Sequence, residues 1–280
     1  MIKDFVFLIR ENTQWLYAII YQNDLFFIDF WSILHFVSGF LISCILISFG
    51  TNRILAKLIL LLISYELIEI SLYFYSLNIF KPEILKDQIT DILLGILGGV
   101  SFLALSLTSK KIIKENISQL LSAFLITFIW VGFYGYKYNI EYFNTIGLNI
   151  WSFTLWFIAS TSILIFYDFI DSKVSKKILS ITILYLVYLI SLFSLEIIGQ
   201  ELLNIHEISK RNATPLIFNL IHGNIYLHIF YLSSPLILLT TNFVISSLIN
   251  KALTKFEYSL DNPLLIFNDI YSKLKDIISQ

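Results

Sequence analysis

The sequence predicts an all-α fold: a polytopic transmembrane helix bundle of about seven spans, with an amphipathic helix at each end of the chain. Of the 280 residues, 57% are hydrophobic and only 14% are charged, and the mean hydropathy is +0.79. Soluble domains have about 25% charged residues, so this composition indicates a multi-pass protein of the cell membrane. Apolar stretches of about 20 residues, long enough to cross a bilayer, fall at 26–49, 54–78, 89–108, 117–136, 148–168, 178–198 and 225–249.

These stretches divide the chain into four parts. Residues 1–25 are predicted to form an interfacial helix, because charged residues interrupt their apolar pattern. Residues 26–108 contain three spans with an unusual set of ionisable side chains, and residues 109–249 contain the other four spans. Within that second half, 199–224 is too polar to cross and could be a re-entrant or surface helix. Residues 250–280 alternate apolar and charged side chains, which predicts an amphipathic tail on the membrane surface or on a partner.

The distribution of positive charge predicts how the spans are oriented. With seven spans, one set of loops contains 12 of the 19 Lys and Arg residues and the other set contains 7. Because Lys and Arg are enriched in cytoplasmic loops, we expect the N-terminus outside and the C-terminus in the cytoplasm.

Composition also limits the partners of the chain. The net charge of −1 argues against nucleic acid, and the lipid bilayer is the partner that the apolar spans require. Cys44 is the only cysteine, so a disulfide within the chain and a paired-cysteine metal or redox site are excluded.

The first three predicted spans contain ionisable side chains, and inserting each of these into a bilayer costs several kcal/mol of free energy. Asp29, His35, Glu66, Glu69 and Asp91 are therefore the candidate catalytic residues, and the predicted orientation places them toward the outer face. A binding or proton-handling site is the usual reason for such a group. The alternative is that these side chains only satisfy one another inside the bundle and do no chemistry.

The spacing of these residues predicts which of them meet. Counted inward from the outer ends of their spans, His35 and Glu69 reach similar depths, so the two can form a pair. Glu66 and Glu69 are three residues apart and share one helix face. Two close carboxylates cannot both ionise cheaply, so we expect one of them to be protonated or bound to a cation.

A divalent metal ion is a candidate cofactor for this group. Asp91, Glu69 and His35 combine carboxylate oxygens with an imidazole nitrogen, a donor set that suits such an ion. Behind Asp91, the pattern Gly95-x-x-x-Gly99 permits the close approach of a neighbouring helix. We therefore expect Asp91 to be pressed against its neighbours.

The second half of the chain repeats the acidic and histidine pattern more weakly. His206, Glu207, His222 and His228 are candidate substrate-binding residues, because the predicted topology places them at or near the outer surface. A solvated loop is the alternative interpretation for His206 and Glu207, and packing at the membrane interface is the alternative for His222 and His228.

Three motifs in the first half follow one another in the order of a known type of membrane protein. They are Asp29-x-x-Ser32-x-x-His35-Phe36-x-x-Gly39, Tyr65-Glu66-x-x-Glu69 and Asp87-Gln88-x-x-Asp91-x-x-x-Gly95-x-x-Gly98. In order and spacing they resemble the VanZ-like and YjdF-like membrane proteins, which carry an Asp/His/Gly helix, a Glu-bearing helix and an Asp-then-Gly helix. The Trp-Asp-Thr run often seen in the YjdF-like type is absent here. The resemblance covers about residues 26–105 and implies a small polytopic prokaryotic membrane protein, without a defined reaction.

Two functional interpretations remain open. Signatures such as HExxH, GxSxG and the P-loop are missing from the sequence. In the first interpretation the outward-facing acidic and histidine group acts on a lipid-linked or amphipathic substrate, as an acid/base or metal site. In the second the protein is a non-enzymatic transport, binding or accessory subunit, and the acidic group is structural.

Overall fold

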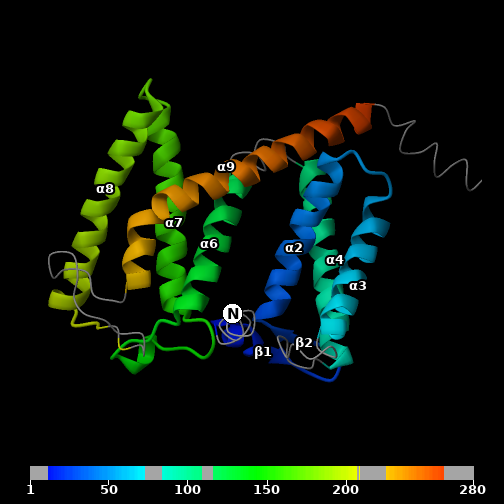
Figure 1. Cartoon of the computed structure of the whole chain (residues 1–280), viewed down its shortest axis with the longest axis horizontal. Coiled ribbons are helices and arrows are strands. Elements are labelled where there is room, and N and C mark those ends of the chain that lie inside the picture. The colour runs from blue at the N-terminus through cyan, green and yellow to red at the C-terminus, as the bar shows by residue number, and fades with distance from the viewer. Residues whose placement is uncertain (1–11, 73–83, 109–115, 207, 209–224, 262–280) are drawn as a thin grey trace, which may run out of the picture. The chain divides into compact units, whose positions relative to one another are not determined.

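The computed structural model describes residues 12–72, 84–108, 116–206, 208 and 225–261, which form a helical membrane bundle (Figure 1). The described residues contain seven α-helices: α2 (Phe30–Ser48), α3 (Ile54–Leu72), α4 (Leu85–Thr108), α6 (Ser118–Tyr134), α7 (Ile150–Asp171), α8 (Lys177–Ile197) and α9 (Ile225–Asp261). Five of them, α2, α4, α7, α8 and α9, contain a stretch long and apolar enough to cross a membrane. The predicted all-α class and multi-span character are therefore confirmed.

The other two helices do not qualify as spans by length and composition alone. α3 carries three charged side chains, Lys57, Glu66 and Glu69, and α6 has 17 residues. Both coincide with predicted spans, so the number of seven spans and their orientation stay predictions.

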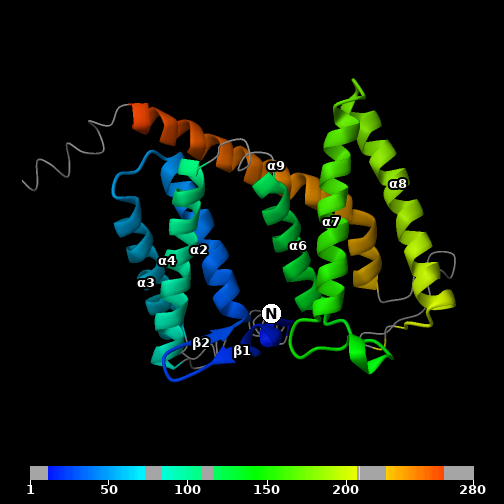
Figure 2. The ribbon, with the colours of Figure 1, turned by 180° about the vertical axis from the view of Figure 1, so that it is seen from behind.

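The chain divides into two compact units. Unit 1 comprises the described parts of Met1–Ile20 and Asn116–Ile245, and unit 2 those of Tyr21–Glu115 and Ser246–Gln280. Figure 2 shows α6, α7 and α8 of unit 1, and α2, α3 and α4 of unit 2, from the back. Helix α9 contributes its first part to unit 1 and its last part to unit 2.

The predicted N-terminal helix is wrong in its second half. Among the described residues, a short 3-10 helix (Gln14–Tyr17) is followed by strand β1 (Ile19–Gln22), which pairs with β2 (Phe27–Asp29). The side chain of Asn23 accepts hydrogen bonds from the backbone N–H groups of Leu25 and Phe26, at 2.8 and 2.7 Å. Such Asn turns reverse the chain, and here the turn replaces the helical path. Residues 1–11 lie outside the described part.

The far end of the chain also differs from the prediction. Helix α9 runs without a break from Ile225 to Asp261, although the span was expected to end at residue 249. No glycine or proline follows residue 249 within the helix to stop it. The rest of the predicted tail, 262–280, lies outside the described residues, as do 209–224 of the predicted polar segment.

In unit 2, α2 and α4 pack with their backbones in close contact. A Cβ atom at Gly39 of α2 would collide with the carbonyl group of Gly95 on α4, and a Cβ at Gly98 would collide with the carbonyl group of Phe36. Small residues permit this approach, so the predicted role of the glycines behind Asp91 is confirmed. The contact fixes α4 against the face of α2 that carries the candidate site.

In unit 1, a tyrosine of α8 compensates for a proline inside α9. Pro235 has no N–H group to donate to the carbonyl oxygen of Tyr231, four residues earlier. The hydroxyl group of Tyr188 donates to that carbonyl oxygen at 2.6 Å, and the hydroxyl of Ser234 donates to the oxygen of Tyr188 at 2.9 Å. These hydrogen bonds hold α8 against the first part of α9.

Candidate functional site

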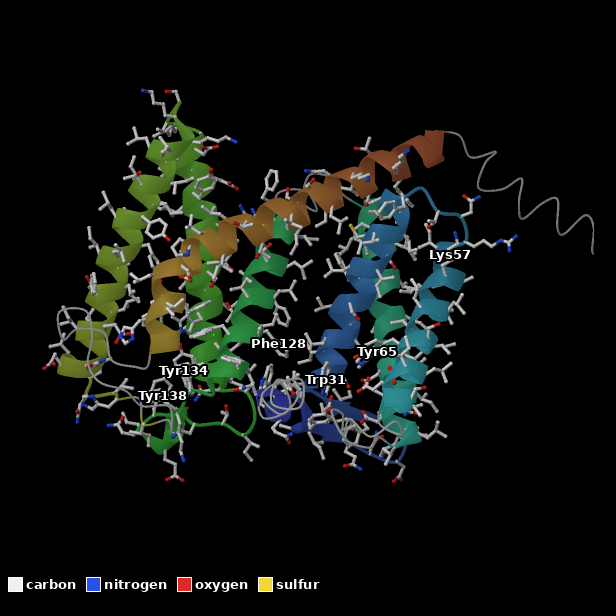
Figure 3. All side chains as sticks on the ribbon, in the orientation of Figure 1. Trp31, Lys57, Tyr65, Phe128, Tyr134 and Tyr138 are labelled. Atoms are coloured by element: carbon white, nitrogen blue, oxygen red, sulfur yellow. The ribbon has the colours of Figure 1, made fainter. Side chains whose placement is uncertain are left out.

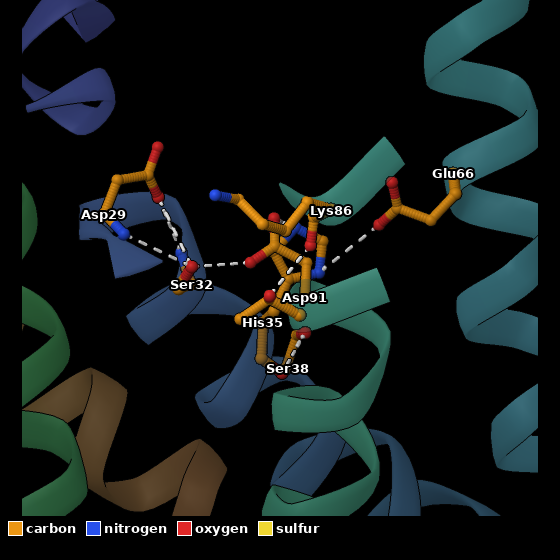
Figure 4. A network of polar contacts seen from close by, with 8 residues as sticks. Asp29, Ser32, His35, Ser38, Glu66, Lys86 and Asp91 are labelled. Carbon is orange, nitrogen blue, oxygen red and sulfur yellow. Dashed lines mark hydrogen bonds and ion pairs between the residues drawn. The ribbon is translucent and has the colours of Figure 1, made fainter. Parts of the chain in front are cut away.

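Three ionisable side chains from three helices of unit 2 meet at one place, which we call the His35 cluster (Figure 4). Its members are His35 of α2, Glu66 of α3 and Asp91 of α4, and their exposed fractions are only 7%, 5% and 1%. His35 Nε2 lies 3.5 Å from Asp91 Oδ2, and His35 Nδ1 lies 3.8 Å from Glu66 Oε1. Each ring nitrogen therefore faces a carboxylate from a different helix.

Ser32 extends the cluster along α2. Its hydroxyl group donates a hydrogen bond to Asp91 Oδ1 at 2.6 Å, a short distance typical of bonds to a charged acceptor. Ser32 lies three residues before His35, so both side chains are on one face of α2. Ser32 was not among the predicted site residues, although its spacing from His35 is visible in the sequence.

Asp29 is the N-terminal cap of α2, and its predicted catalytic role stays a prediction. It precedes α2, where its carboxylate accepts a hydrogen bond from the backbone N–H of Ser32 at 3.0 Å, and its own N–H faces Ser32 Oγ at 3.4 Å. This reciprocal arrangement is a capping box, which stabilises the first turn of a helix. Asp29 is linked to the His35 cluster through Ser32, and it also interacts electrostatically with Asp91.

His35 was expected to pair with Glu69, but in the structure its partner on α3 lies one helical turn earlier. The contact that the His35 ring makes on α3 is with Glu66, which lies three residues before Glu69. Glu69 is also buried and interacts electrostatically with Glu66 and with Asp87 of α4. The ring of Tyr65, labelled in Figure 3, packs edge to face with the ring of His35, with 5.5 Å between the centroids. An aromatic ring thus lies beside this group of acids.

Two buried carboxylate oxygens in this region have no hydrogen-bond partner among the described residues. They are Glu66 Oε2 and Asp87 Oδ1, and both side chains are 5% exposed. Leaving a buried polar atom unsatisfied costs about 1–3 kcal/mol, and native structures tolerate few such atoms. These oxygens are the positions at which the cluster can still accept a hydrogen bond.

The charges of the region do not balance. Asp29, Glu66, Asp87 and Asp91 are buried together, and His35 is the only buried basic side chain beside them among the described residues. Lys86 directs its ammonium group to the carbonyl oxygen of Asn23 at 2.6 Å. Because like charges at short distance cannot all ionise cheaply, protons or cations must neutralise part of this group.

The order of the contacts excludes one familiar mechanism. In a Ser-His-Asp triad the histidine lies between the serine and the acid, whereas here Asp91 lies between Ser32 and His35. No three His, Cys, Asp or Glu side chains of the described residues are arranged to hold a metal ion. The described geometry gives no support to the predicted metal ligands His35, Glu69 and Asp91, which stay a prediction.

Of the four candidate substrate-binding residues of the second half, the structure describes His206 and His228. His206 is exposed, and its ring faces the side-chain oxygen of Asn204 at 2.5 Å. His228 is buried on α9 with 3% exposure. Glu207 and His222 lie outside the described residues. The role of all four in substrate binding stays a prediction.

No known family model matches the chain, and no curated protein or solved structure is significantly similar to it. The resemblance to VanZ-like and YjdF-like proteins therefore rests on the order of the three motifs alone.

Proposed function

We propose that the His35 cluster is a proton-exchanging acid/base site that acts on the polar group of a lipid-linked or amphipathic substrate. One observation carries the proposal: the buried ring of His35 faces carboxylates of two other helices, beside a buried carboxylate oxygen, Glu66 Oε2, that has no partner among the described residues. A purely structural network would be expected to satisfy its buried oxygens.

The two contacts of the ring give His35 the geometry of a proton relay. A neutral imidazole donates through one ring nitrogen and accepts through the other. It can therefore accept a proton from one carboxyl group while it donates to the carboxylate on its other side. A proton moves between Asp91 and Glu66 in this way when the ring changes tautomer, and the Ser32 hydroxyl stabilises the charged form of Asp91.

Glu66 is the group that would meet the substrate. Its Oε1 atom faces His35, and its Oε2 atom is available to accept a hydrogen bond or to deliver a proton. A carboxyl group in apolar surroundings can act as a general acid. The five helices that are long and apolar enough to cross a membrane support a site among lipids, which favours an amphipathic substrate over a freely soluble one.

The proposal includes the orientation with the N-terminus outside, so that the cluster acts near the outer leaflet. Reporter fusions after Lys114 and Lys177 should then read cytoplasmic, and fusions after Lys81 and Lys137 should read external, because of the distribution of Lys and Arg. A cytoplasmic signal after Lys81 would move the site to the inner leaflet.

Labelling with a hydrophobic carbodiimide tests the acid/base function. This reagent reacts with protonated carboxyl groups in apolar surroundings, and peptide mass spectrometry locates the product. In the lipid-embedded protein, Glu66 should be modified, since its Oε2 atom has no hydrogen-bond partner among the described residues. Exposed Glu201 on η5 (Ile198–Leu202) is the control and should stay unmodified at neutral pH. Modification of Glu201 without modification of Glu66 or Asp91 would count against a protonated cluster.

A further inference from the structure

Unit 1 contains a cavity of about 730 Å³, formed by α7, α8 and the first part of α9. This volume lies in the range of small-molecule sites, about 300–1,000 Å³. Every residue that lines it belongs to unit 1, so the cavity is separate from the His35 cluster of unit 2.

One end of the cavity is polar. Glu196, near the end of α8, accepts hydrogen bonds from Gln200 Nε2 at 3.0 Å and from the hydroxyl group of Tyr231 at 3.2 Å. The hydroxyl group of Tyr138 is hydrogen-bonded to that of Ser152, in the first turn of α7, at 2.8 Å. These groups lie at the end of unit 1 where α7 begins and α8 ends, which Figure 3 marks with Tyr138.

The walls of the cavity become apolar along the helices. Phe166 on α7 and Leu184 on α8 line its other end, with Leu155, Ile158 and Val187 between. Ser152 and Phe166 are separated by fourteen residues, or about 21 Å of helix, and the hydrocarbon core of a bilayer is about 30 Å thick. The cavity is therefore long enough to hold an acyl chain along the helices, with a polar end and a largely apolar remainder.

This gradient matches the orientation of a lipid molecule. Aromatic residues mark the depth of lipid head groups in membrane proteins, and Tyr138, Phe143 and Trp151 line the polar end. Leu155, Ile158 and Leu195 have strongly exposed side chains on spans, so the cavity is open to lipid along its length. An occupant can enter from the bilayer without crossing water.

The side chains at the polar end of the cavity indicate which kind of lipid head group would bind there. Glu196 is the acidic side chain that lines the cavity, and no Lys or Arg of the described residues lines it. A carboxylate prefers a cationic hydrogen-bond donor, and aromatic faces attract an ammonium group. We propose that the cavity binds a membrane lipid whose head group carries an ammonium, with that ammonium at Glu196 and the acyl chains along α7 and α8.

Tryptophan fluorescence tests the proposal with the full chain in lipid nanodiscs. Trp151 and Trp156 line the cavity, so bromine atoms on the acyl chains of a bound lipid will quench them. In nanodiscs of phosphatidylglycerol, brominated phosphatidylethanolamine should reach half-maximal quenching at about a tenfold lower fraction than brominated phosphatidylglycerol, because only the first carries an ammonium.

Glu196→Gln should remove this tenfold preference, because the amide keeps the shape of the side chain and loses its charge. Glu201→Gln is the matched control, since Glu201 lies on the next helical turn, is exposed and does not line the cavity, and it should keep the preference. The double variant Trp151→Phe and Trp156→Phe should lose the head-group-dependent part of the quenching. Equal quenching of the unmodified chain by the two lipids overturns the proposal whatever the variants do. A preference that survives in Glu196→Gln, or in the double variant, overturns the assignment to this cavity.

Discussion

Replacing Asp91 with leucine is expected to lower the free energy of unfolding by about 3 kcal/mol. The change removes the acceptor of the Ser32 hydroxyl group and the carboxylate that faces His35 Nε2. Both groups are buried, with no solvent to replace the lost partner. Thermal and denaturant unfolding of the purified protein in detergent measures the loss.

Asp91→Asn is the matched variant. The amide keeps the size of the side chain and an oxygen that can accept from Ser32, so the expected loss is under about 1 kcal/mol. Comparable losses in the two variants would show that the charge of Asp91, and not its hydrogen bonds, stabilises the fold. No loss in Asp91→Leu would mean that the observed contacts contribute nothing to stability.

Gly98→Ala is expected to destabilise unit 2 by about 3 kcal/mol, at the upper end of the usual cost of overpacking. Its Cβ atom would meet the backbone carbonyl group of Phe36, which cannot rotate away as a side chain could. Helices α2 and α4 would have to separate, and this would also lengthen the contact between His35 and Asp91. Gly39→Ala should act in the same way, through the carbonyl group of Gly95.

The control for these variants is Gly199→Ala. A Cβ atom at Gly199 would meet nothing within 4 Å among the described residues, so the change should be close to neutral in the same unfolding measurement. Equal effects at Gly98 and Gly199 would argue that helix propensity, and not the contact of α2 with α4, determines the cost.

The spans could be predicted from the sequence because the bilayer sets their length and polarity. The strands β1 and β2 could not, since Ile19, Ile20, Phe26 and Phe27 are as apolar as the residues of a helix, and a single side chain, Asn23, reverses the chain between them. Helix α2 therefore begins at Phe30, and Asp29 is its N-terminal cap.

The members of the candidate site could be predicted more fully than their contacts. Ionisable residues in apolar stretches identified His35, Glu66 and Asp91, and the glycine pattern indicated the close packing of α4. Glu66 and Glu69 lie one turn apart on the same face, about 4.5 Å along the axis. Which of them meets His35 depends on the axial offset of α3 against α2, and tertiary packing alone sets that offset.

No pattern in the sequence predicted the cavity of unit 1. It depends on how α8 is held against α9, and that contact depends on a hydrogen bond from Tyr188 to a carbonyl group that Pro235 leaves without its helical donor. The proline was visible in the sequence, but its compensating partner lies 47 residues earlier, on another helix.

The infrared absorption of protonated carboxyl groups tests the central claim, proton exchange in the His35 cluster, most directly. Spectra of the lipid-embedded protein recorded across pH should contain a carboxyl band that decreases as the pH rises. Glu66→Gln and Asp91→Asn should each reduce the band, and each should shift the pH at which the remainder titrates, because His35 couples the two acids. A band that is independent of pH, or that is unchanged in both variants, would contradict the account and leave the cluster as a structural element.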